Sequence, residues 1–226
     1  MTEKRSTKTI IGLIIAGVLA IIVALGALGF FQFYQTADNL YKQGNVFGEV
    51  PMKDGAYTAV KITGYAKNPI ATIDGGTKLY LIEFSKTDTD DFGYASIEVK
   101  DGDKLIDKLN AADDLVENPV IVAAKIRKSG ADGAVRNYTI EFKDTISENE
   151  TISKLAETEY YASVYEFDKD RQFSYIIAGI AGIIALVFFY SAFATRKSED
   201  KAYNELYSAY PELNYSMDSV LEDATY

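Results

Sequence analysis

Two long apolar runs interrupt a chain that is otherwise rich in charged residues. Residues 10–31 and residues 173–194 span 22 positions each, and neither run contains Asp, Glu, Lys or Arg. A helix rises about 1.5 Å per residue, so each run can cross a hydrocarbon core about 30 Å thick. Aromatic residues suited to the headgroup region stand near the ends of the runs, among them Phe33, Tyr34 and Tyr190. The pattern predicts two transmembrane helices with membrane lipid as their partner.

Basic residues lie on the outer flanks of the two runs, and their positions predict the orientation. They are Lys4, Arg5 and Lys8 before the first run and Arg196, Lys197 and Lys201 after the second. Because basic residues near helix ends stay in the cytoplasm, residues 1–9 and 195–226 are expected inside a plasma membrane and residues 32–172 outside. The first run also resembles a secretory signal, but it exceeds the usual apolar length of about 7–15 residues, so we expect a retained anchor.

Between the runs, residues 50–143 read as short β-type segments separated by turn residues. The expected strands cover residues 57–65, 78–84, 94–99, 120–126 and 135–142, and residues 103–110 have apolar positions at helical spacing. Three strands, a helix and two strands is the order of the five-stranded OB-fold barrel. We therefore predict a membrane protein in which two transmembrane α-helices flank a small, mainly-β, OB-like domain. An irregular β-sandwich is the alternative.

Two polar segments connect this domain to the apolar runs, and a third follows the second run. Residues 32–49 and 144–172 are expected to be stalks, and residues 35–47 would prolong the first helix outward. The second stalk would be either a helix that continues into the second run or an extended piece, which the alternation of Tyr161, Ser163, Tyr165 and Phe167 equally suggests. Residues 195–226 are acidic and rich in tyrosine. This tail is expected to be a partly ordered cytoplasmic segment or a docking site for a protein.

Small residues form a stripe on each predicted membrane helix, and these stripes are the candidate packing sites. They are Gly12, Ala16, Ala20 and Ala24 in the first run and Ala178, Ala181, Gly182 and Ala185 in the second. Small side chains let helix backbones approach closely in a membrane. We therefore expect packing through these residues, either within one chain or by self-association of copies.

The amino-acid composition excludes several classes of catalytic and metal-binding site. The 226 residues include no Cys and no His, and the net charge is −10. Without Cys and His there is no Ser-His-Asp triad, no thiol nucleophile and no ordinary zinc site, so we expect no enzyme, no metal and no cofactor. The acidic balance argues against nucleic-acid binding, because that affinity comes from neutralising phosphates. No charged residue lies within either apolar run, which favours anchors over a channel or a pump.

Two acidic features of the sequence are candidate chemical sites. Asp88, Asp90 and Asp91 resemble the start of a calcium loop with Gly93 at the sixth position, but Val99 stands where the loop needs a glutamate ligand. We therefore expect a solvated turn there. A pair of carboxylates about 5–10 Å apart in a cleft would support glycosidase chemistry, which leaves a carboxylate-dependent envelope enzyme as a minor alternative.

The order of anchor, OB-like domain, anchor and short acidic tail resembles, at the level of architecture, two-pass membrane proteins of Gram-positive bacteria with an extracytoplasmic domain. The lack of cysteine suits such a cell envelope. No motif accompanies the resemblance, so it implies no site residue. The expected function is a non-enzymatic membrane protein that presents its outer domain to a protein or an envelope ligand. The alternative is a sensor or accessory subunit of a membrane complex that signals through the tail.

Overall fold

The computed structural model describes residues 2–49, 51–73, 76–86, 92–128 and 160–209. The chain divides into two compact units. Leu28–Tyr175 form the barrel unit, and Met1–Ala27 together with Ile176–Tyr226 form the helical unit.

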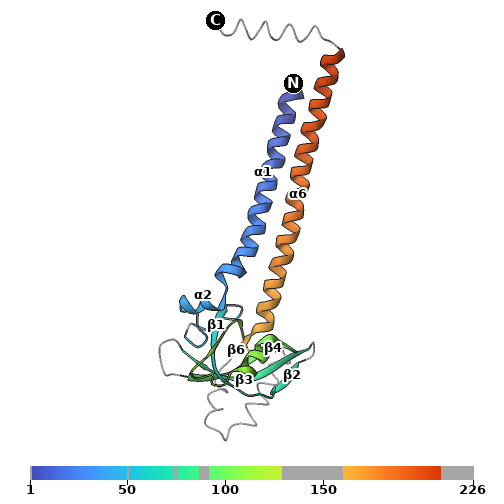
Figure 1. The fold of residues 1–226 in the computed structure, drawn as a ribbon. Helices are drawn as coiled ribbons and strands as arrows, with labels where there is room; N and C mark the ends of the chain where they lie inside the picture. Colours follow the sequence, from blue (N-terminus) through green and yellow to red (C-terminus); the bar gives the residue numbers. More distant parts are fainter. Residues whose placement is uncertain (1, 50, 74–75, 87–91, 129–159, 210–226) are drawn as a thin grey trace. The chain divides into compact units, whose positions relative to one another are not determined.

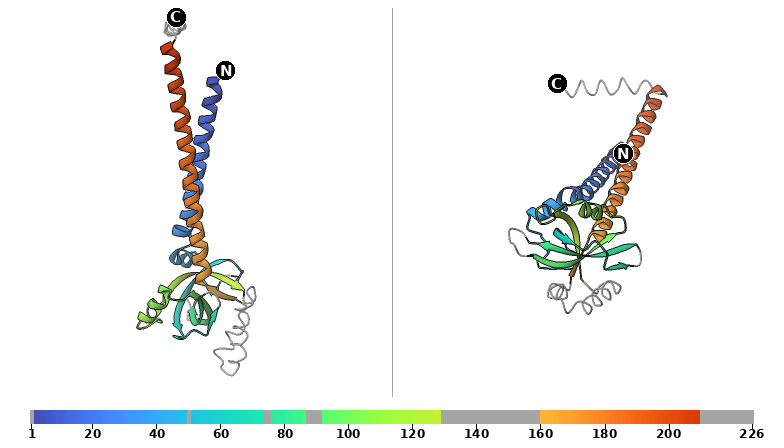
Figure 2. Two further views of the ribbon diagram at one scale, coloured as in Figure 1. Left: turned by 90° about the vertical axis from the view of Figure 1, so that its right-hand side faces the viewer. Right: turned by 60° about the horizontal axis from the view of Figure 1, so that its bottom comes forward.

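The helical unit is built from helix α1 (Thr2–Gly29) and from the larger part of helix α6 (Val164–Ala209). Within this unit the two helices lie side by side (Figures 1 and 2). The stretches Thr7–Tyr34 and Val164–Leu206 are long and apolar enough to cross a membrane. The two long apolar helices predicted from the sequence are therefore present.

The barrel unit contains five strands that close into a ring. They are β1 (Tyr57–Tyr65), β3 (Thr77–Ser85), β4 (Phe92–Lys100), β5 (Val120–Lys128) and β6 (Tyr160–Ser163). The ring runs β1-β5-β6-β4-β3 and returns to β1. β4 and β6 pair in parallel, and the other pairs are antiparallel. A short strand β2 (Ala71–Ile73) extends the sheet by pairing with β3.

The predicted elements agree closely with this barrel up to β5. The first four expected strands coincide with β1, β3, β4 and β5, and the expected helix is α3 (Lys104–Ala111), which Asp103 caps by accepting a hydrogen bond of 2.8 Å from the amide of Leu105. The small closed barrel of the prediction is confirmed. The expected strand 135–142 lies outside the described residues.

Two segments expected to be stalks contribute to the barrel unit instead. β6 supplies the strand between β5 and β4, and it lies within the predicted stalk 144–172. In the other predicted stalk, residues 32–49, the first helix does not simply continue outward. It is followed by a π-helix η1 (Phe30–Tyr34) and by helix α2 (Ala37–Lys42). Leu40, Val46 and Phe47 are buried, so this segment is held by apolar burial against the barrel.

Residues 45–47 cover the part of β1 that β3 does not reach. The amide of Ala59 donates to the carbonyl of Asn45 at 2.8 Å, and the amide of Phe47 donates to the carbonyl of Ala59 at 2.9 Å. A bulge between Ile62 and Gly64 marks the point where β1 pairs with β3. The free edge of β1 is thus protected from pairing with another chain.

The barrel core is built from inward-facing residues of the five strands of the ring. Val60, Ile62, Ile82, Ile97 and Ile126 are fully buried, and Leu105 and Leu109 of α3 join the same cluster. Phe84 packs edge-on against Phe47 with ring centroids 5.2 Å apart. A Cβ on Gly93 would lie 2.7 Å from the Phe84 ring, so only glycine leaves room for that ring.

Candidate functional site

Three aromatic rings meet in the barrel unit where η1, β1 and α6 come together. Phe31, Tyr57 and Phe167 stand in a triangle, with centroid distances of 5.5 Å (Phe31 to Tyr57), 5.6 Å (Phe31 to Phe167) and 5.5 Å (Tyr57 to Phe167). All three pairs have edge-to-face geometry, which contributes about 0.5–1.5 kcal/mol per pair beyond area burial. The triangle joins segments from both ends of the unit's sequence to the first barrel strand.

A set of charged side chains extends this contact between the barrel and α6. Lys125 Nζ lies 2.7 Å from Asp170 Oδ2, and the Tyr57 hydroxyl donates to the same oxygen at 2.9 Å. Arg127 lies 3.2 Å from Glu166 Oε2, and its Nε lies 3.2 Å from Asp54 Oδ1. We call the aromatic triangle and these five charged residues the junction cluster.

Burial and charge at the junction affect its acid–base behaviour. Burial raises the pKa of the Tyr57 hydroxyl, and the hydrogen bond to the Asp170 carboxylate adds to the rise. Tyr57 therefore remains a protonated donor at every physiological pH. Lys125 and Arg127 face outward from β5 at alternate positions, which brings both cations to the first two turns of α6.

A buried carboxylate lies next to the point where β6 becomes α6. Glu98 of β4 is only 6% exposed, and it is the register partner of Ser163, the last residue of β6. The Ser163 hydroxyl donates to Glu98 Oε2 at 2.6 Å and accepts from the amide of Glu166 at 3.0 Å. One hydroxyl thus caps the first turn of α6 and connects it to the barrel wall.

The environment of Glu98 disfavours its charged form. Burial is the main cause that raises its pKa, while hydrogen bonds from Ser163 and Thr77 and the charge of Arg127 act in the opposite direction. The carboxylate-enzyme hypothesis requires a carboxyl group with a raised pKa in an open cleft. Glu98 has the raised pKa, but it lies buried beside Ser163 and does not line a cleft.

Sequence reasoning did not find the role of Glu98 or the residue at which α6 begins. The alternation of β4 placed Glu98 on the face opposite Ile97, but it gave no sign that another element covers that face. The start of α6 did carry a signal. Ser163 followed by Glu166 matches the capping-box pattern, in which a serine precedes an acidic residue by three positions at a helix start.

The predicted small-residue stripes differ in their surroundings within the helical unit. Ala178, Ala181 and Ala185 are buried, and Gly182, Ala16, Ala20 and Ala24 are partly buried. Gly12 is exposed, and a Cβ there would meet nothing within 4 Å. The glycine in contact is Gly17, where a Cβ would lie 3.0 Å from the Phe189 ring.

Large apolar side chains point outward from the same helices. Leu19 is 57% exposed, Ile183 is 64% exposed and Leu186 is 70% exposed. The core helix of a water-soluble protein would bury such residues and expose smaller or polar ones. The helices therefore present an apolar surface outward.

Other candidate sites fall partly or wholly outside the described residues. The aspartates at 88, 90 and 91 lie in the segment 87–91 and the tail beyond residue 209 lies in 210–226, both outside the described part. Among the residues that are described, no group of three or more acidic, His or Cys side chains could hold a metal ion.

Comparisons with protein-family models, with curated proteins and with solved structures find no match to this chain. The class that the fold defines is a small closed β-barrel flanked by two long apolar helices.

Proposed function

We propose that this chain is a non-enzymatic, two-pass protein of the plasma membrane that presents an OB-like barrel outside the cell to a protein or envelope ligand. The observation that carries the proposal is the outward-facing apolar surface of two helices that flank one folded barrel. Transfer of such surface out of water is favourable by about 25 cal/mol per Å². The basic residues on the outer flanks of both helices favour cytoplasmic termini.

The absence of cysteine from the sequence allows a direct topology test. Val116, which is 71% exposed in the barrel unit, and Ser208, which is exposed on α6, are each replaced by cysteine in the full chain. Intact cells are treated with a membrane-impermeant maleimide, and permeabilised cells serve as the control. We expect V116C to be labelled in intact cells and S208C only after permeabilisation. The reverse pattern would place the barrel in the cytoplasm, and release of the chain by alkaline carbonate would contradict membrane insertion.

The interaction role needs a separate measurement. A photo-cross-linking residue at Phe92 or Val116, two exposed apolar positions of the barrel, is expected to give a discrete cross-linked species in whole cells. The mass of the full chain in mild detergent is then measured by light scattering. A lone monomer in detergent, together with no cross-link at either position, would contradict a presenting role.

The junction cluster favours a second candidate, a sensor or accessory subunit that passes the state of the barrel to the cytoplasmic tail. Asp170 and Glu166 connect the first turns of α6 to β5 through Lys125 and Arg127, so a change in barrel shape would act on the base of this helix. Deletion of residues 198–226 tests the idea. The deletion is expected to reproduce the phenotype of a complete gene deletion, and an unaltered phenotype would exclude signalling through the tail.

A further inference from the structure

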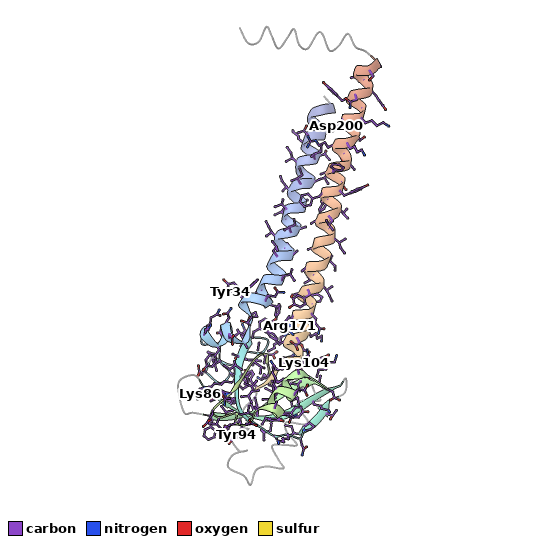
Figure 3. All side chains as sticks on the ribbon, viewed as in Figure 1. Tyr34, Lys86, Tyr94, Lys104, Arg171 and Asp200 are labelled. Carbon is purple, nitrogen blue, oxygen red and sulfur yellow. The ribbon has the colours of Figure 1, made fainter. Side chains whose placement is uncertain are left out.

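Five exposed aromatic side chains in the barrel unit stand at the ends of the predicted membrane spans. Their exposed fractions are 42% for Phe30, 69% for Phe33, 66% for Tyr34, 62% for Phe173 and 39% for Tyr175. They come from two segments that lie at the two ends of this unit's sequence. We call this set the aromatic collar. Figure 3 shows Tyr34 and Arg171 at one end of the barrel unit, and Lys86 and Tyr94 toward the other.

The π-helix η1 contributes aromatic residues both to the junction cluster and to the aromatic collar. A π-helix has i→i+5 hydrogen bonds and therefore more residues per turn than an α-helix, which changes the faces on which the following side chains lie. Phe31 turns inward and is 7% exposed in the junction cluster, while Phe30, Phe33 and Tyr34 point outward. Phe31 thus belongs to the junction cluster, and its ring also contacts that of the half-exposed Phe30, with centroids 5.1 Å apart.

The order of residues along both segments indicates what covers the collar. Toward the barrel strands, each segment has charged residues close to its aromatic residues. Asp38 and Lys42 follow the first segment, and Asp168 and Arg171 precede the second. On the far side, each segment continues directly into an uncharged apolar run. Aromatic rings between a charged zone and an apolar zone are typical of the boundary between lipid headgroups and acyl chains. A protein partner would not require this same order on both segments.

We propose that the aromatic collar lies in the headgroup region of the outer leaflet and sets the depth at which the barrel unit meets the membrane. This inference rests on the proposed two-pass function and adds its lipid-facing residues. The charged residues of the junction cluster then lie just outside the bilayer, because Asp170 is three residues from Phe173 in the same helix. At about 1.5 Å per residue, these three residues of α-helix correspond to about 4.5 Å along the helix axis.

The sequence contains no tryptophan, so single substitutions provide a depth probe. F33W and F173W report on the collar, L19W reports on the middle of the first span, and F92W is the matched control. Phe92 is 52% exposed and packs against Tyr94 with ring centroids 5.9 Å apart, at the opposite end of the unit. Each full-length variant is placed in phosphatidylcholine vesicles with bromine either near the headgroup end or near the methyl end of the acyl chains.

We expect the headgroup-proximal bromine to quench most of the emission of F33W and F173W, the methyl-end bromine to quench L19W most, and neither to quench F92W. If L19W is quenched but F33W and F173W are not, the proposed position of the collar is wrong, whereas the membrane span is supported. Stronger quenching of F33W and F173W by the methyl-end bromine would also overturn it, because the rings would then lie in the acyl region. Unquenched L19W would contradict the membrane span itself.

Discussion

The two units of the chain place the same residue types in opposite environments. In the barrel unit, Ile97 is fully buried, and polar or charged side chains occupy most exposed positions. In the helical unit, Ile183 is 64% exposed while Ala185 is 3% exposed. A barrel core gains stability by removing large apolar groups from water. An apolar helix pair in lipid gains it through close contact of small residues, because lipid tails are as apolar as leucine. The contrast is what the proposed membrane insertion of the helical unit requires.

The largest expected effect comes from making one substitution in both environments. I97A removes fully buried methyl groups from the barrel and should reduce the free energy of unfolding by about 2–5 kcal/mol. I183A removes the same groups from an exposed helix position and should change it by less than about 0.5 kcal/mol. Urea unfolding of the full chain in mild detergent, followed by near-ultraviolet circular dichroism, measures both. Equal losses in the two variants would contradict the difference in environment.

The junction cluster is where the barrel holds the base of α6, and D170A tests it. The substitution removes the acceptor of Tyr57 and the partner of Lys125, whose side chain is 18% exposed. We expect a loss of about 1–3 kcal/mol, as for a hydrogen-bonded charged group that is partly buried. D113A is the matched control, because Asp113 is exposed in the barrel unit. Hydrogen exchange of the first turns of α6 should increase in D170A and stay unchanged in D113A.

Sequence reasoning recovered most of the barrel because its signals are local. The apolar alternation of β3, β4 and β5 and the capping Asp103 of α3 depend on residues close in sequence. The alternation of Tyr161 and Ser163 suggested an extended piece at β6, but its place in the barrel was missed because that depends on pairing with β4 and β5, which are far away in the chain. The same limit applies to the candidate sites. The alternation of β4 gave no sign that Glu98 is buried, because its burial depends on β6, whose Ser163 is distant in the chain and hydrogen-bonds to it.

For the small-residue stripes, residue spacing alone does not identify the helix face that makes the contact. Four-residue spacing in α1 selected Gly12, but the glycine that faces Phe189 is Gly17. Gly12 and Gly17 differ by five positions, so they lie on different faces of the helix. Spacing predicts that small residues share a face, but the choice between faces depends on the position of the other helix.

Gly17 therefore provides the next sharpest test of the helical unit. G17L inserts a side chain where even a Cβ would lie 3.0 Å from the Phe189 ring, and overpacking of this kind lowers stability by about 1–3 kcal/mol. G12L is the matched control, since nothing lies within 4 Å of that position. Unfolding by increasing fractions of SDS, followed by far-ultraviolet circular dichroism, compares the two. A larger loss for G12L would show that the predicted stripe, and not Gly17, makes the helix contact.

The smallest expected effect is a pH dependence of the barrel's stability against unfolding. Because burial raises the pKa of Glu98, the folded barrel holds this proton to a higher pH than the unfolded chain, where the pKa is about 4.3. The contribution of Glu98 to stability is therefore present below that value and is lost as the pH rises through the raised pKa. Arg127 and Glu166 also act on Glu98, while Ser163 and Thr77 hydrogen-bond to it.

E98Q isolates this effect, because glutamine keeps an acceptor for Ser163 and cannot ionise. The wild-type chain should lose more stability than E98Q as the pH rises, and the two curves should converge in acid. Urea unfolding in mild detergent at a series of pH values measures the difference. E83Q is the control, since Glu83 lies on the same sheet and accepts hydrogen bonds from Thr63 and Tyr94, but is only partly buried. An E98Q curve parallel to that of wild type would mean that the protonation of Glu98 is not coupled to folding, and burial in the barrel wall would then have no measurable effect on this carboxyl group.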